Sequence, residues 1–266
     1  MRRHLSLIFA AFALASFVHA EEWTKTYTIA TKPELRVDTD DVNLRVDTWD
    51  QQSIEARLTT GNLKIGDGGV RILEHQNGDV VELQVHMTHR YQVCIVCVNV
   101  HSNRVNLEIR MPREGRVNLH TADGSIALSN FKGDMELESG DGGLEINSVD
   151  GSLRSHTGDG RIHARGRFDS LQLSSGDGRV ETEVLPGSAV RSAWDVHTGD
   201  GSISLTLPGS FAADIVLRTG DGHITLDMPV TVEGRLSRSD IRGKLNGGGN
   251  LLSVHTGDGS IHLGRS

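Results

Sequence analysis

Aspartate recurs in this chain at a spacing that could place carboxylates side by side. Asp123, Asp141, Asp159 and Asp177 lie 18 residues apart, each in a Thr/Ser-x-Asp-Gly motif. Strands stacked with that period would bring the carboxylates to about 4.8 Å from one another, where like charges repel unless cations or hydrogen bonds offset them. One hypothesis is therefore a calcium-binding repeat module, although calcium takes six or more oxygen ligands.

We favour a structural corner over calcium at these motifs, and we expect no metal. Glycine can adopt the positive φ of a sharp bend, aspartate can accept bonds from backbone N–H groups, and an inward Thr or Ser can bond the backbone freed there. Calcium-binding nonapeptide solenoids carry Asp in each half of the coil, whereas the second corner here holds residues such as Lys132-Gly133. The predicted corner glycines are Gly124, Gly142, Gly160, Gly178, Gly201, Gly222 and Gly259.

Histidine also recurs, at a constant offset before the corner, in His120, His156, His197 and His255. By strand parity these side chains face outward. The intervening coils hold other residue types at that offset, so the run of imidazoles that zinc would favour is not maintained. Those other residues are Glu138, Ser174 and Arg218. We therefore interpret the histidines as part of a solvated face.

Two cysteines, Cys94 and Cys97, stand in a Val/Ile run that reads as a strand. A redox pair would sit at a helix start, where the dipole lowers the thiol pKa. On a strand, residues i and i+3 point to opposite faces, so a local disulfide would need a bend. We favour inert thiols or a structural disulfide over redox or metal chemistry.

No catalytic constellation stands out, and we expect neither an enzyme nor a cofactor. Asp and His recur in every repeat, so their pairing carries little information, and no unrepeated Ser-His-Asp arrangement is evident. An extracellular polysaccharide-acting enzyme remains an alternative. It would need a cleft with perturbed carboxylates on one face.

The fixed period predicts an all-β, parallel β-solenoid whose coils of about 18 residues hold two short strands and two corners. Regular repeats cover residues 105–266, and a less regular β-rich region, 21–104, continues or caps them. Apolar residues alternate with polar ones along each strand, which predicts an inward set. That set is Leu119, Ile126, Leu128, Met135, Leu137, Leu144, Ile146, Leu153, Ile162, Leu171, Leu173, Val180, Val196, Ile203, Leu205, Ile215, Leu217, Ile224, Leu226, Leu252, Val254, Ile261 and Leu263.

The first 20 residues resemble a secretory signal peptide. Arg2 and Arg3 precede an apolar stretch that ends at the small-residue site Val18-His19-Ala20. We therefore expect export to the periplasm, the cell surface or the medium, with no transmembrane segment after cleavage. The formal charge of −8 becomes −10 once Arg2 and Arg3 are removed, which argues against nucleic-acid binding.

Residues 107–128, which run from a strand through Met111-Pro112 to the first Asp corner, carry a family resemblance, as do residues 250–263. They resemble the bacterial "putative adhesin" β-solenoid family, a DUF4097-like domain of unknown function. The resemblance implies a β-solenoid at the envelope or outside the cell, with no established catalytic residues. We therefore expect a non-catalytic adhesin or envelope scaffold that binds a protein or another cell-surface component.

The calcium hypothesis makes a direct prediction about thermal stability. If the Asp motifs are structural corners, EDTA should leave the melting temperature of the mature chain unchanged. A drop of many degrees on chelation, restored by added calcium, would instead establish a structural calcium site. Thermal melts followed by circular dichroism distinguish the two.

Overall fold

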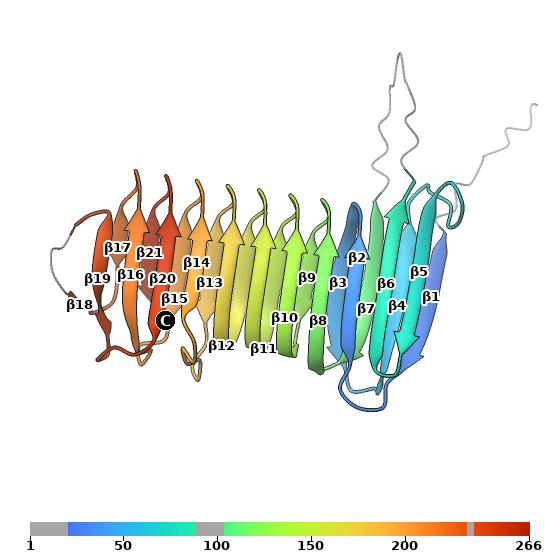
Figure 1. Ribbon diagram of the computed structural model, residues 1–266, viewed down its shortest axis with the longest axis horizontal. Helices are drawn as coiled ribbons and strands as arrows, with labels where there is room; N and C mark the ends of the chain where they lie inside the picture. Colours follow the sequence, from blue (N-terminus) through green and yellow to red (C-terminus); the bar gives the residue numbers. More distant parts are fainter. Residues whose placement is uncertain (1–20, 89–103, 233–236) are drawn as a thin grey trace, which may run out of the picture.

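The computed structural model describes residues 21–88, 104–232 and 237–266, and within these ranges every regular element is a β-strand (Figure 1). The strands are β1 (Glu22–Thr28), β2 (Glu34–Thr39), β3 (Val42–Trp49), β4 (Ser53–Thr60), β5 (Val70–Asn77), β6 (Val80–Met87), β7 (Val105–Pro112), β8 (Glu114–Thr121), β9 (Ile126–Ser129), β10 (Lys132–Ser139), β11 (Leu144–Thr157), β12 (Ile162–Ser175), β13 (Val180–Val184), β14 (Trp194–Thr198), β15 (Ile203–Leu207), β16 (Ala213–Thr219), β17 (Ile224–Leu226), β18 (Thr231–Val232), β19 (Asp240–Leu245), β20 (Leu251–Thr256) and β21 (Ile261–Arg265). Cys94 and Cys97 lie outside the described residues, as does the expected signal peptide. In the described ranges no helix is long and apolar enough to cross a membrane.

The strands form two ladders that run along the long axis of the molecule (Figure 1). Ladder 1 has the order β1-β4-β7-β3-β9-β11-β12-β13-β15-β21-β17. Ladder 2 has the order β5-β6-β2-β8-β10-β11-β12-β14-β20-β16-β19-β18. The long strands β11 and β12 begin in ladder 1 and end in ladder 2. Most neighbours are parallel, which confirms the predicted solenoid class.

The core lies between the two ladders and is made of the inward-facing residue of every second position. In β8, for example, Val117, Leu119 and Thr121 are buried, while the residues between them are not. The predicted inward set is buried throughout, except for Ile224 and Leu226. These two are half-buried because their strand, β17, is the last of ladder 1 and has a pairing partner on one side.

The order of the coils in space differs from their order in the sequence. The coil β2–β3 lies between β6–β7 and β8–β9, and the last coil, β20–β21, lies between β14–β15 and β16–β17. The 37 residues from Asp221 to Asp258 equal about two periods, but they do not form two consecutive coils. Instead, β19 runs back antiparallel to β16, and the chain then returns to insert β20–β21.

The N-terminal end of the stack is closed by side chains that join the two ladders. The Tyr27 hydroxyl of β1 donates a hydrogen bond to the Glu74 carboxylate of β5, and Lys25 Nζ lies 3.0 Å from the same carboxylate. These bonds hold the pKa of Glu74 below its usual value, while burial raises the pKa of Tyr27. Because these side chains join the edge strands β1 and β5, this end of the stack is less accessible to strands of other chains.

A buried hydroxyl at each Asp corner links that corner to the one before it. Thr157 Oγ1 accepts a bond from the Gly160 N–H at 3.2 Å and donates one to the Gly142 carbonyl of the preceding coil at 2.9 Å. The Ser139, Ser175, Thr219 and Thr256 hydroxyls make the same two bonds. The hydroxyls therefore form a nearly continuous hydrogen-bonded column inside the corner edge.

The corner glycines are needed for a different reason from the one expected. None of the seven has a positive φ, so the expectation of a left-handed bend is wrong. A Cβ on Gly142 would instead come within 1.9 Å of the Gly124 carbonyl oxygen, and a Cβ on Gly160 within 2.0 Å of the Gly142 oxygen. Real side chains cannot approach a backbone oxygen so closely, and so stacking itself requires glycine here.

Thr157 and Thr182 provide a matched test of the hydroxyl column. Thr157→Val should lower the free energy of unfolding by about 1–3 kcal/mol, because the buried Gly160 N–H loses its partner. Thr182 Oγ1 is equally buried but has no hydrogen-bond partner, so Thr182→Val should leave stability unchanged or raise it. Urea denaturation of both variants measures the difference, and equal losses would contradict a structural role for the column.

Candidate functional site

The four aspartates predicted from the 18-residue spacing occupy successive corners of the stack. The backbone of each corner bonds to the next; for example, Gly158 N donates to Gly140 O and Gly176 N to Gly158 O, both at 2.5 Å. Because the last coil is inserted, the column continues in the spatial order Asp200, Asp258, Asp221. The corner edge therefore carries one carboxylate per coil.

These carboxylates do not brace the bend as the sequence suggested. Across the described chain, the side chains of Asp141, Asp159 and Asp177 make no hydrogen bond or ion pair. At Asp123, partial loss of solvent raises the pKa of the carboxyl group, and the neighbouring charges of Asp41 and Asp141 raise it further. The column is thus an edge of like charges that the backbone and the hydroxyls hold together.

The described residues contain no group of three or more His, Cys, Asp or Glu side chains that could hold a metal ion. One carboxylate per coil supplies fewer oxygen atoms at any one point than the six to eight that calcium takes. The calcium hypothesis for Asp123, Asp141, Asp159 and Asp177 therefore depends on the chelation experiment.

The outward histidines of ladder 2 lie in one row across the strands. Insertion of β20 places His255 directly beside His197, whereas the sequence order would have put Arg218 there. Ser174 Oγ lies 3.2 Å from His156 Nδ1 and 2.9 Å from His197 Nε2. The shared offset of Ser174, His156 and His197 is consistent with these contacts, whereas the placement of His255 beside His197 depends on the insertion of β20, which the sequence order does not show.

Ser174, His197 and Asp195 resemble the order of groups in a catalytic triad, contrary to our expectation that no such arrangement exists. His197 Nδ1 lies 3.5 Å from Asp195 Oδ2. However, Asp195 and His197 are exposed and Ser174 is half-buried, in the middle of ladder 2, where β12 and β14 each pair with a strand on both sides. The backbone N–H groups there are committed to the ladder, so they cannot stabilise an oxyanion. The arrangement does not support acyl transfer.

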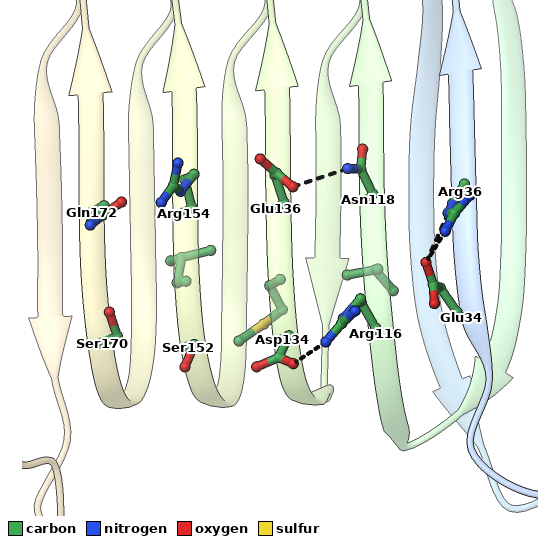
Figure 2. Close-up of a pocket in the computed structure, with 13 residues that line it drawn as sticks. Glu34, Arg36, Arg116, Asn118, Asp134, Glu136, Ser152, Arg154, Ser170 and Gln172 are labelled. Atoms are coloured by element: carbon green, nitrogen blue, oxygen red, sulfur yellow. Dashed lines mark hydrogen bonds and ion pairs between the residues drawn. The ribbon is translucent and has the colours of Figure 1, made fainter. Parts of the chain in front are cut away.

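A shallow groove of about 610 Å³ crosses ladder 2 over β2, β8, β10, β11 and β12 (Figure 2). Its polar side chains come from outward positions that repeat every 18 residues, so that one row holds Arg116, Asp134, Ser152 and Ser170. The next row holds Asn118, Glu136, Arg154 and Gln172. The floor is the backbone of the ladder itself, because the intervening apolar side chains point into the core.

The groove has two halves that differ in how their polar groups are bonded. Toward β2 and β8, the side chains satisfy one another, as the dashed lines in Figure 2 show. Arg116 bonds Asp134 at 3.1 Å, Asn118 bonds Glu136 at 3.0 Å and Arg36 bonds Glu34. Toward β11 and β12, Ser152, Arg154 and Gln172 make no side-chain hydrogen bond or ion pair with any described residue. The second half therefore keeps its hydrogen-bonding groups available.

No motif in the sequence points to this groove. The only signal for it was the 18-residue offset between outward positions, and those positions hold mixed residue types with no recurring motif. The groove is identified by which of its charged side chains are paired, and that requires the side-chain directions that the structure provides.

The architecture defines this protein as a two-ladder β-solenoid of stacked coils. The chain belongs to the Toastrack DUF4097 family, whose model matches residues 40–264. No curated protein matches it.

Several solved structures are similar to this chain, among them the following three. A protein of Clostridium sporogenes described as a "putative cell adhesion protein" is 16% identical, with 93% of this chain and 100% of that chain covered and a TM-score of 0.45. A "putative adhesin" of Bacteroides fragilis is 11% identical over 91% and 97%, with a TM-score of 0.44. A "putative lipid binding protein" of Parabacteroides distasonis is 14% identical over 91% and 96%, with a TM-score of 0.48. Likenesses this distant carry no argument about function.

The pKa of Asp123 predicts how the acidic column affects stability. A folded-state pKa raised above the unfolded value of about 3.9 means that stability falls as pH rises through the folded pKa. Asp123→Asn should therefore raise the melting temperature at pH 7 in low salt, and the gain should vanish near pH 3 and in high salt.

Asp221→Asn is the matched control for that variant. Asp221 ends the column beside Asp258 alone, so its gain should be smaller. Equal gains for the two variants, or a loss at Asp123, would show that repulsion within the column does not limit stability.

Proposed function

We propose that this protein is an exported, non-catalytic β-solenoid that acts as an adhesin or cell-envelope scaffold. The observation that carries the proposal is the outer face of ladder 2. It presents rows of polar side chains at strand spacing on a rigid array, with a shallow groove rather than an enclosed cleft. Such a face suits recognition of an extended surface better than conversion of a small substrate.

Export is supported by the signal-like segment at residues 1–20. A protein or another component of the cell surface is the partner that this location and face would meet. The partner's contacts would have to be polar, since aromatic residues make up 4% of the sequence.

The non-catalytic role is supported by how the candidate chemical groups are bonded. The groove carboxylates Asp134 and Glu136 bond to Arg116 and Asn118, an arrangement that leaves no free acid–base pair there. The Ser174 cluster lacks donors for an oxyanion.

A calcium-dependent binding module is the second candidate, favoured by one observation. Partial loss of solvent, and then the negative charges of Asp41 and Asp141, raise the pKa of Asp123, and a divalent cation would offset those charges. Binding of the partner that survives EDTA would exclude this candidate.

Charge reversal on the two faces tests the proposal. Arg116→Glu alters ladder 2, and Arg165→Glu alters ladder 1, where Arg165 pairs with Glu183 at 2.8 Å. Binding of each mature chain to envelope fractions from a strain lacking the protein is measured by sedimentation. Retention should fall severalfold for Arg116→Glu and stay near the wild-type level for Arg165→Glu. Equal retention of all three proteins would refute ladder 2 as the binding face.

A further inference from the structure

Among the described residues, one arginine of the ladder 2 groove has no acidic partner, although three acids lie on the neighbouring strand. Arg154 is exposed on β11, beside β10, which carries Asp134, Glu136 and Glu138 on the same outward face. All three of these carboxylates face side chains of β8 instead. Those contacts are Asp134 with Arg116 at 3.1 Å, Glu136 with Asn118 at 3.0 Å and Glu138 with His120 at 3.7 Å.

On its other side Arg154 meets only neutral hydrogen-bonding groups. The register places Gln172 of β12 directly opposite Arg154, with Ser170 and Ser174 before and after it. Ser152 precedes Arg154 on the same face of β11. Figure 2 shows Arg154, Ser152, Ser170 and Gln172 grouped on β11 and β12, away from the bonded pairs. A guanidinium that has neutral groups on one side, and on the other a carboxylate already bonded elsewhere, is suited to an anion that the chain itself does not supply.

We propose that this half of the groove binds the carboxylate of an acidic sugar within an otherwise neutral oligosaccharide. Arg154 holds the carboxylate through two N–H donors, and Ser152 and Gln172 bond the neighbouring sugar hydroxyls. The inference rests on the proposed function, because it names the ligand class for the same face of ladder 2.

The groove favours a glycan over a peptide because its floor is already hydrogen-bonded. β11 and β12 pair with strands on both sides, so neither offers the free edge that a peptide strand would extend. The side chains that remain available in this half are polar, and they recur at the strand spacing of about 4.8 Å. Hydroxyl groups along an extended sugar chain match such a row, with recognition by hydrogen bonds rather than by aromatic stacking.

The surrounding charge favours an isolated carboxylate over a polyanion. The chain has a formal net charge of −8, and Asp134, Glu136 and Glu138 line the next strand. A heavily sulfated or phosphorylated polymer would meet repulsion from these acids beyond the first contact. A ligand with one carboxylate at Arg154 and neutral sugars beyond it would not meet this repulsion.

Titration calorimetry of the mature chain tests the proposal with 3′-sialyllactose, a glucuronate-containing disaccharide and neutral lactose. At least one acidic sugar should bind at least tenfold more tightly than lactose. Arg154→Gln should weaken that binding at least tenfold, whereas Arg45→Gln, which removes an exposed arginine of ladder 1, should not. Glu136→Gln should tighten it, because the nearest competing carboxylate is gone.

Each other outcome overturns the proposal. The proposed carboxylate site is refuted if neither acidic sugar binds. It is also refuted if Arg154→Gln binds the acidic sugar as tightly as the wild-type protein does. If envelope fractions still retain the wild-type protein in either case, the proposed adhesive function stands with a different ligand. If the wild-type protein binds neither the acidic sugars nor the envelope fractions, both proposals are refuted.

Discussion

Stacking in this protein depends on a hydroxyl that bonds to two successive corners at once. Thr157 joins the Gly160 N–H of its own corner to the Gly142 carbonyl of the coil before it. The bonds are buried, so leaving either partner unmatched would cost free energy that a surface bond would not. The same geometry brings the corner backbones so close that a side chain on Gly142 would collide with the Gly124 oxygen. Close stacking of the corners therefore requires both the buried hydroxyl and the glycine.

The inserted coils make the two ends of the stack unlike a simple repeat. β2–β3 and β20–β21 each lie between coils that are far away in sequence. Each inserted coil thus pairs on both sides, while β1 and β17 end ladder 1 and β5 and β18 end ladder 2. The inserted coils resist fraying, because opening either one breaks hydrogen bonds to two neighbouring coils.

Charged side chains are arranged differently on the two ladder faces and on the corner edge. Across the faces, opposite charges meet on neighbouring strands, as Arg116 meets Asp134 and Arg165 meets Glu183. Along the corner edge, like charges lie next to one another, and partial loss of solvent together with these charges raises the pKa of Asp123. Among the three arginines that line the groove, Arg154 is the one without an acidic partner in the described chain, and this distinguishes its half of the groove from the other.

The sequence by itself determined the coil, its period and its inward face, because 18-residue spacing and strand alternation are local properties. It also singled out the Thr/Ser-x-Asp-Gly corner, although it assigned the glycine to positive φ and not to close stacking. Only the tertiary structure decided the order of the coils, and hence that His255 lies beside His197. It also decided which charges are paired in the groove. In an array of near-identical coils any strand can pair with several others, so the choice depends on how the whole stack is assembled.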